Sequence, residues 1–266
     1  MKYLTRPFSI CAVNYLNTVP LVWGMQHGPQ REQAALTFEL PAVCAEVIER
    51  NEAQIGLAPV AEVARQGLEV APGHGIACHG AVRSILLVSR VPVRSIRTLA
   101  VDLSSRTSVQ LARIVLRELY GVQPEFRARP PLLEDMLAEC EAALLIGDPA
   151  LRLDPAALPY ETLDLGAEWQ ALTGLPMVFA LWAGKAPPLG DGLGTVLEGS
   201  YQFGHSHIAD IVEQQFHLRG VTRELAHEYL THYIHFEIGD LEMKGLEAFL
   251  KLAGLPQIAV AEAASQ

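Results

Sequence analysis

Short apolar runs alternate with segments of helical spacing along most of the chain. In the first part, apolar runs typical of buried strands lie at 10–13, 55–59, 76–78 and 82–88. Helical spacing separates them over 42–49 and 60–66. This alternation predicts an α/β protein, with strands buried between helices.

A second block of the same kind begins near residue 95. Strands are predicted at 99–102, 142–146 and 177–183, and helices at 107–120, 132–139 and 167–172. The helix that begins at Thr107 has the clearest apolar stripe and ends at Gly121.

The remainder of the chain has a different character. Residues 185–194 are rich in proline and glycine and are predicted to be a connector. Everything beyond is predicted to be helical, with apolar stripes over 208–216, 225–233 and 246–253. The last ten residues are expected to form a frayed tail.

Composition narrows the class of protein. The chain has 266 residues, 50% of them hydrophobic, and a net charge of -10, which indicates one large or two closely packed domains. No cluster of lysine and arginine is present, so we expect no nucleic-acid partner. The apolar run at 8–13 is shorter than the ~7–15 residues of a secretory signal core, and no run approaches the ~18–20 residues of a membrane span. We therefore expect a cytoplasmic protein without a membrane partner, with its four cysteines as buried thiols.

The nine histidines do not form a metal motif in sequence. His227 and His232 resemble the H-E-x-x-H helix, but their spacing of five turns the two rings roughly 140° apart. His232 and His235 can face the same side, yet no third ligand lies beside them in sequence. We predict no metal site. Fingerprints of serine hydrolases, dinucleotide-binding proteins and P-loop proteins are also absent from the sequence.

Polar residues stand where three predicted strands end. These turns cover residues 14–20, 104–108 and 147–149. Ligands of open α/β sheets bind at the carboxyl ends of strands, and the free N–H groups of a helix start attract anions. Ordinary helix capping explains each turn singly, but together they favour a site for a small carboxylate.

Five colinear stretches resemble the chorismate dehydratases of the futalosine route to menaquinone. Residues 13–21 read V-N-Y-L-N-T-V-P-L, and similar matches follow at 82–90, 105–113, 145–151 and 164–182. One position departs from the family pattern, because Met177 follows Pro176 where phenylalanine is expected. Methionine fills irregular apolar sites well, so this change concerns the shape of the pocket.

The resemblance implies a two-lobed fold like that of type II periplasmic binding proteins. Two crossover segments, expected near 89–97 and 180–187, would join the lobes. Lobe one would comprise 1–92 and 184–266, with the helical C-terminal part packed on it, and lobe two would comprise 93–183. The ligand would lie in the cleft between them.

The resemblance also implies a reaction and a site. The reaction is the cofactor-free dehydration of chorismate to 3-[(1-carboxyvinyl)oxy]benzoate. Asn17 and Ser84 are the expected catalytic residues. Substrate binding is assigned to Tyr15, Ser105, Arg106, Thr107, Ser108, Gly147, Asp148 and Thr173.

Among the expected site residues Asp148 is the single candidate base, and the quoted motifs contain no histidine. We therefore expect the substrate to remove its own proton.

Two other functions stay open from the sequence. Dihydroxynaphthoate synthase, an enzyme of the same pathway, shares the expected fold. A solute-binding protein without catalytic activity would show the same cleft. The sequence does not reveal the oligomeric state, and a homodimer is left open.

Overall fold

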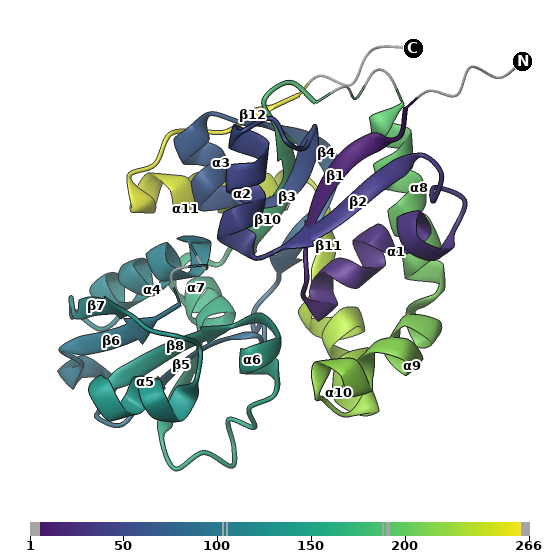
Figure 1. Ribbon diagram of the computed structural model, residues 1–266. Coiled ribbons are helices and arrows are strands. Elements are labelled where there is room, and N and C mark those ends of the chain that lie inside the picture. The colour runs from purple at the N-terminus through teal and green to yellow at the C-terminus, as the bar shows by residue number, and fades with distance from the viewer. Residues whose placement is uncertain (1–5, 103, 105, 188, 190–191, 262–266) are drawn as a thin grey trace, which may run out of the picture.

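The strands form two separate sheets in the computed structural model, which describes residues 6–102, 104, 106–187, 189 and 192–261 (Figure 1). Within that part of the chain the first sheet has seven strands in the order β11-β4-β10-β3-β1-β2, with β12 also beside β4. They are β1 (Phe8–Val13), β2 (Ala34–Glu39), β3 (Ile55–Pro59), β4 (Glu69–Cys78), β10 (Met177–Gly184), β11 (His235–Ile238) and β12 (Ala259–Val260).

The second sheet has five described strands in the order β7-β6-β8-β5-β9. They are β5 (Ile85–Ser89), β6 (Thr98–Val101), β7 (Glu125–Ala128), β8 (Ala142–Ile146) and β9 (Glu161–Asp164). β3, β5 and β8 are buried at every position, as expected for central strands covered on both faces. This arrangement confirms the α/β class and the two-lobed architecture.

Helices cover both sheets (Figure 1). Those with the first sheet are α1 (Val19–His27), α2 (Pro41–Glu49), α3 (Val60–Gln66), α8 (Leu193–Ser206), α9 (Ile208–Arg219), α10 (Arg223–Glu228) and α11 (Asp240–Ala253). Those with the second sheet are α4 (Arg106–Glu118), α5 (Leu133–Glu139), α6 (Gly147–Leu151) and α7 (Leu165–Thr173). Two short 3₁₀ turns, η1 (Leu16–Thr18) and η2 (Val93–Ser95), and a π-helical turn, η4 (Tyr229–Tyr233), complete the description.

The chain changes sheet at residues other than those expected. β5 pairs antiparallel with β8 and β9, so it belongs to the second sheet. β10 pairs antiparallel with β3 and β4, so it belongs to the first. The crossovers are thus 79–84 and 174–176, in place of the expected 89–97 and 180–187. The error arose because a fully apolar strand has the same sequence pattern in either sheet.

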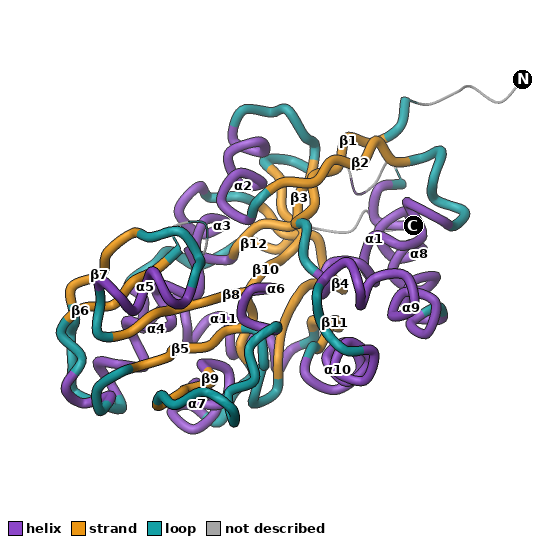
Figure 2. Tube along the Cα trace, turned by 60° about the horizontal axis from the view of Figure 1, so that its bottom comes forward, coloured by secondary structure: helices purple, strands orange, loops and turns teal. Residues whose placement is uncertain are grey.

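We call the part built on the first sheet (6–78 and 177–261) the first lobe and the part built on the second sheet (85–173) the second lobe. The expected lobe boundaries, after residues 92 and 183, assigned β5 to the first lobe and most of β10 to the second. The pairing of the strands shows the reverse. In both views, α6 lies on the side of the second lobe that faces the first lobe (Figures 1 and 2).

The C-terminal helices pack on the first lobe, as expected. α8 lies along α1 so closely that a Cβ on Gly204 would stand 2.0 Å from the carbonyl oxygen of Pro20. The expectation of helix alone was wrong, however, because β11 and β12 both join β4 in the first sheet. In the described residues, none of the helices is long and apolar enough to cross a membrane.

Candidate active site

A cleft between the lobes receives polar side chains from both of them. It encloses about 600 Å³, including space open to solvent, and most of its wall is apolar. The polar side chains come from three places along the chain: Tyr15, Asn17 and Thr18, then Ser84, then Arg106, Thr107 and Ser108. The turns at 14–20 and 104–108 therefore meet at one cleft, as the sequence predicted.

A chain of hydrogen bonds connects the two predicted catalytic residues. The Asn17 side-chain amide donates to the hydroxyl of Tyr229 at 3.1 Å, and that hydroxyl donates to Ser84 Oγ at 2.8 Å. Burial raises the pKa of the Tyr229 phenol, so the hydroxyl stays protonated and remains the hydrogen-bond donor to Ser84. Tyr229 thereby holds Asn17 and Ser84 in fixed positions beside the cleft.

Sequence reasoning assigned Tyr229 only to an apolar helical stripe. Its ring is indeed buried, with 1% of its surface exposed. A buried tyrosine normally finds a partner for its hydroxyl, and that was the signal available in the sequence. The signal does not name the partner, which here lies 212 residues away at Asn17.

The start of α4 contacts the first lobe through Thr107. The Thr107 hydroxyl donates to the carbonyl of Phe179 at 3.2 Å and accepts from the amide of Ala61 at 3.2 Å. Its single proton is therefore directed to a protein carbonyl, while the residue also lines the cleft, and its expected role in substrate binding stays a prediction. Thr107 joins the two lobes at the edge of the cleft. Ser105 lies outside the described residues.

Arg106 and Thr18 bring polar atoms without a described protein partner to the cleft. The Nε of Arg106 is buried without a hydrogen bond to any described residue, and lies 4.0 Å from Glu62 Oε1. The Thr18 hydroxyl is also buried with no partner among those residues. Buried polar atoms are nearly always paired, so each of these groups can donate a hydrogen bond to a water or a ligand in the cleft. A guanidinium fork matches the two oxygens of a carboxylate.

Gly147 and Tyr15 form a tight contact at the cleft wall. The backbone of Gly147 is left-handed, with φ +60°, and a Cβ there would stand 2.7 Å from the Tyr15 ring. Burial, aided by the nearby carboxylates of Asp102 and Asp148, raises the pKa of Tyr15 to about 12. The Tyr15 side chain is therefore uncharged, and its hydroxyl keeps a proton that it can donate in a hydrogen bond. Both residues line the cleft, as predicted.

Asp148 joins the lobes instead of lining the cleft. Its Oδ1 accepts from the amide of Leu16 at 3.0 Å, and its Oδ2 pairs with Arg219 at 3.0 Å. Both partners belong to the first lobe, whereas Asp148 begins α6 of the second. The expected substrate contact of Asp148 is therefore replaced by a contact between lobes, and Arg219 was missed because it lies 71 residues away.

Thr173 lies at the second crossover, away from the cleft. Its hydroxyl donates to the carbonyl of Trp169 at 2.9 Å and accepts from the amide of Leu175 at 3.1 Å. Thr173 is not among the described residues that line the cleft, and its expected role in substrate binding stays a prediction. The side chain ends α7, where the chain returns to the first lobe.

The described lining of the cleft includes neither a histidine nor a carboxylate. Its ionisable members are Arg106, a permanent cation, and Tyr15, which stays protonated at neutral pH. Such a site binds, orients and donates hydrogen bonds, but it offers no ordinary general base.

Comparison with known proteins gives a family and a fold. The sequence pattern of a family described as "Menaquinone biosynthesis" matches residues 8–254. A chorismate dehydratase of Thermus thermophilus is 27% identical over 271 residues, covering 94% of this chain and 97% of that protein.

Solved structures share the fold at lower identity. A protein of Archaeoglobus fulgidus superposes with a TM-score of 0.76 at 15% identity, covering 95% of this chain and 98% of that one. The periplasmic aliphatic sulphonate binding protein of Escherichia coli gives 0.61 at 14% identity, covering 98% and 96%. A Candida albicans gene product described as having the generic periplasmic binding protein fold gives 0.60 at 14%, covering 94% and 90%. These likenesses confirm the expected fold.

Proposed function

The chain belongs to the menaquinone biosynthesis family, and on that basis we propose that it is a chorismate dehydratase. Similarity to the Thermus thermophilus enzyme over almost the whole of both chains supports this activity. The reaction removes water from chorismate and gives 3-[(1-carboxyvinyl)oxy]benzoate, without a cofactor. A proton leaves the ring carbon that bears the enolpyruvyl ether, and the hydroxyl leaves the neighbouring carbon.

The observation that carries the mechanism is the lack of a histidine or carboxylate among the described residues of the cleft lining. A base is still needed to take the proton. The enolpyruvyl carboxylate of the substrate is tethered next to that proton, so the substrate itself supplies the base. The carboxylate passes the proton that it has taken up to the departing hydroxide, which leaves as water, and aromatisation of the ring drives the reaction forward.

The protein then contributes position and hydrogen bonds. Arg106 and the start of α4, which it begins, would hold a substrate carboxylate, and Thr18 offers a hydroxyl that has no hydrogen bond to a described residue. Asn17 and Ser84, fixed by Tyr229, face the departing hydroxyl. A water-poor site of oriented donors favours the transition state without a protein base.

The direct test mixes the purified protein with chorismate and follows the absorbance of the aromatic product. Turnover to 3-[(1-carboxyvinyl)oxy]benzoate supports the proposal. A thermal shift without product would identify a solute-binding protein instead. Turnover of a later intermediate, with none of chorismate, would identify a dihydroxynaphthoate synthase.

Asn17→Ala examines the catalytic assignment within that assay. Loss of one such donor typically lowers kcat by about 10²–10³-fold, and that is the expected result. Substrate binding should persist, as measured by calorimetry under single-turnover conditions. A variant with the kcat of the wild type would remove Asn17 from the mechanism.

The cellular setting follows from the same proposal. The enzyme would act in the futalosine route in the cytoplasm, on a small-molecule substrate and without a nucleic-acid or membrane partner. A homodimer remains open to measurement by ultracentrifugation.

A further inference from the structure

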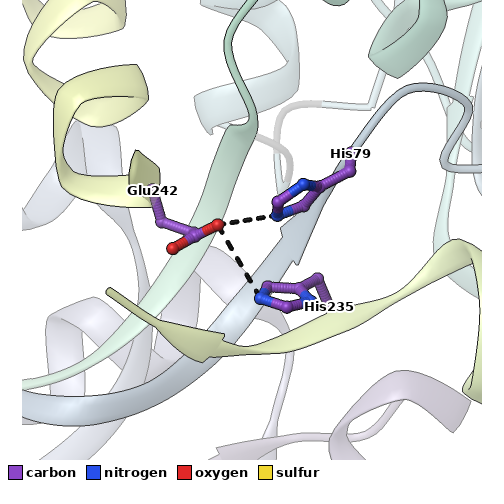
Figure 3. A group of neighbouring side chains, drawn as sticks. All are labelled: His79, His235 and Glu242. Atoms are coloured by element: carbon purple, nitrogen blue, oxygen red, sulfur yellow. Dashed lines mark hydrogen bonds and ion pairs between the residues drawn. The ribbon is translucent and has the colours of Figure 1, made fainter. Parts of the chain in front are cut away.

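His79 meets two side chains from much later in the sequence, His235 and Glu242 (Figure 3), and none of the three is part of the described lining of the cleft. His79 Nε2 lies 2.6 Å from Glu242 Oε1, and His235 Nε2 lies 3.7 Å from the same oxygen. The two imidazole rings lie 4.4 Å apart between centroids. The potential ligand atoms all lie within 4.8 Å of one another.

The surroundings of Glu242 hold its carboxylate in place. Glu242 is in the first turn of α11 and has 5% of its surface exposed. Its other oxygen, Oε2, accepts from the backbone amide of Gly239 at 2.9 Å, which leaves Oε1 directed at the two histidines. Carboxylates that bind metal ions are commonly held in place by hydrogen bonds of this kind. The imidazoles of His79 and His235 are each about 40% exposed, so an ion can reach them from solvent.

The cluster lies where the two lobes are connected. His79 follows β4 directly and begins the first crossover, 79–84. His235 begins β11, which pairs with β4. Glu242 is on α11, whose Gly245 packs so tightly on the second crossover that a Cβ would stand 2.1 Å from the carbonyl of Pro176. None of the three side chains lines the cleft.

We propose that His79, His235 and Glu242 bind a divalent first-row transition ion such as Zn²⁺ beside the crossovers. The ion would stabilise the hinge, by which we mean the two crossovers that connect the lobes, and would take no part in the reaction. Two imidazoles and one carboxylate are a common three-ligand set for zinc, with water in the fourth place. At Zn–N distances of about 2.0–2.1 Å, tetrahedral ligand atoms stand about 3.3 Å apart. The atoms reach that spacing when His79 and Glu242 separate slightly and His235 moves slightly closer to them. The ion would tie the first crossover to β11 and α11.

Zinc titration of the metal-free protein tests the site. Wild-type protein, freed of metal and of any affinity tag, is titrated with Zn²⁺ against a chromophoric chelator. We expect one tightly bound ion per chain. The double variant His79→Gln with His235→Gln should bind Zn²⁺ more than about 100-fold more weakly, because loss of supporting groups alone costs about 10–100-fold. Glu242 is left unchanged because it also caps α11.

A matched control removes two exposed histidines elsewhere. His227→Gln with His232→Gln should bind Zn²⁺ as the wild type does. Equal thermal melting of all proteins without metal excludes a folding defect. The proposal fails if wild type takes up no stoichiometric ion, or if the His79 and His235 double variant binds as tightly as wild type.

Hydrogen exchange examines the role in the hinge. Addition of Zn²⁺ should slow amide exchange across residues 79–84 in wild type and in the His227 and His232 control. It should have no such effect in the His79 and His235 double variant. Unchanged exchange in zinc-loaded wild type would contradict the role in the hinge.

Discussion

At the scale of single residues, the cleft depends on polar groups that fix one another. Asn17 and Ser84 are both bonded to Tyr229, and Arg106 and Thr18 keep atoms without a described partner. The first set is thus held in place before substrate arrives, and the second set is ready to bind it. Groups held in advance cost no reorganisation during the reaction, which is the main source of electrostatic catalysis.

Tyr229→Phe should lower kcat by about tenfold or more. The change keeps the buried ring but leaves the Asn17 amide and the Ser84 hydroxyl without their common partner, and an unsatisfied buried group costs about 1–3 kcal/mol. Steady-state kinetics with chorismate, alongside a thermal melt, measure the effect. Tyr233→Phe, in the same π-helical turn but nearer to solvent, is the control and should retain the wild-type kcat. Equal rates in both variants would contradict the positioning role.

Gly147→Ala should both destabilise the fold and weaken substrate binding. An alanine at φ +60° costs about 1–2 kcal/mol, and its Cβ would in addition displace the Tyr15 ring. Gly121→Ala is a matched control, because φ there is +71° and its Cβ would meet nothing within 4 Å. Denaturant unfolding and KM measure the two effects. The expectation is a rise in KM for Gly147→Ala alone.

At the scale of helices and strands, the sequence predicted fully buried elements well and edge elements poorly. The strands at 55–59 and 142–146 were predicted with their exact bounds, because continuous apolar runs bounded by turns are distinctive. β2 and β9 were missed, because both carry polar or exposed positions along their length. Which sheet a strand joins depends on its neighbours, and periodicity does not encode neighbours.

The candidate site divides in the same way. Tyr15, Asn17, Arg106 and Gly147 were predictable because each lies in a polar turn after an expected strand. Ser84 was assigned through the stretch at 82–90 that resembles the family. Tyr229, Arg219 and the His79 cluster were not, because their partners are distant in sequence. Thr107 lines the cleft as expected, whereas Asp148 is not part of its described lining, and the hydrogen bonds of both side chains go to the other lobe.

Thr107→Val should raise KM for chorismate about tenfold. Valine has the same shape but removes both hydrogen bonds that dock the start of α4 on β10 and α3, each worth about 0.5–1.5 kcal/mol. Thr107→Ser restores the hydroxyl and should return KM close to the wild-type value. A Val variant with unchanged KM, measured under the same conditions, would show that this contact does not contribute to closure.

At the scale of the whole molecule, the lobes are joined on several sides of the cleft. Thr107 bonds to the first lobe at one edge, and Asp148 bonds to Leu16 and Arg219 at another. Tyr229 of the first lobe bonds to Ser84 at the end of the first crossover. These bonds therefore hold the two lobes together around the cleft.

Asp148→Asn should weaken closure while turnover continues. The amide keeps an oxygen for Leu16 but loses the charge paired with Arg219, and a charge-assisted hydrogen bond is worth about 1.5–3 kcal/mol. We expect KM to rise about tenfold, kcat to stay within a few-fold, and small-angle scattering to show a larger radius of gyration. Loss of turnover with intact substrate binding would instead identify Asp148 as the base.

The position of β10 determines which of the two lobes can fold first while the chain is being synthesised. β10 lies between β3 and β4, yet it follows them by about a hundred residues, after every strand of the second sheet. Until residues 177–184 emerge from the ribosome, β3 and β4 have no strand to connect them, whereas the second sheet already has all its strands. The second lobe can therefore be complete while the first is still open, and insertion of one strand then joins the halves of the first sheet. The strand that joins these two halves also carries Phe179, so the docking site for Thr107 forms in the same event, before β11 and β12 are added.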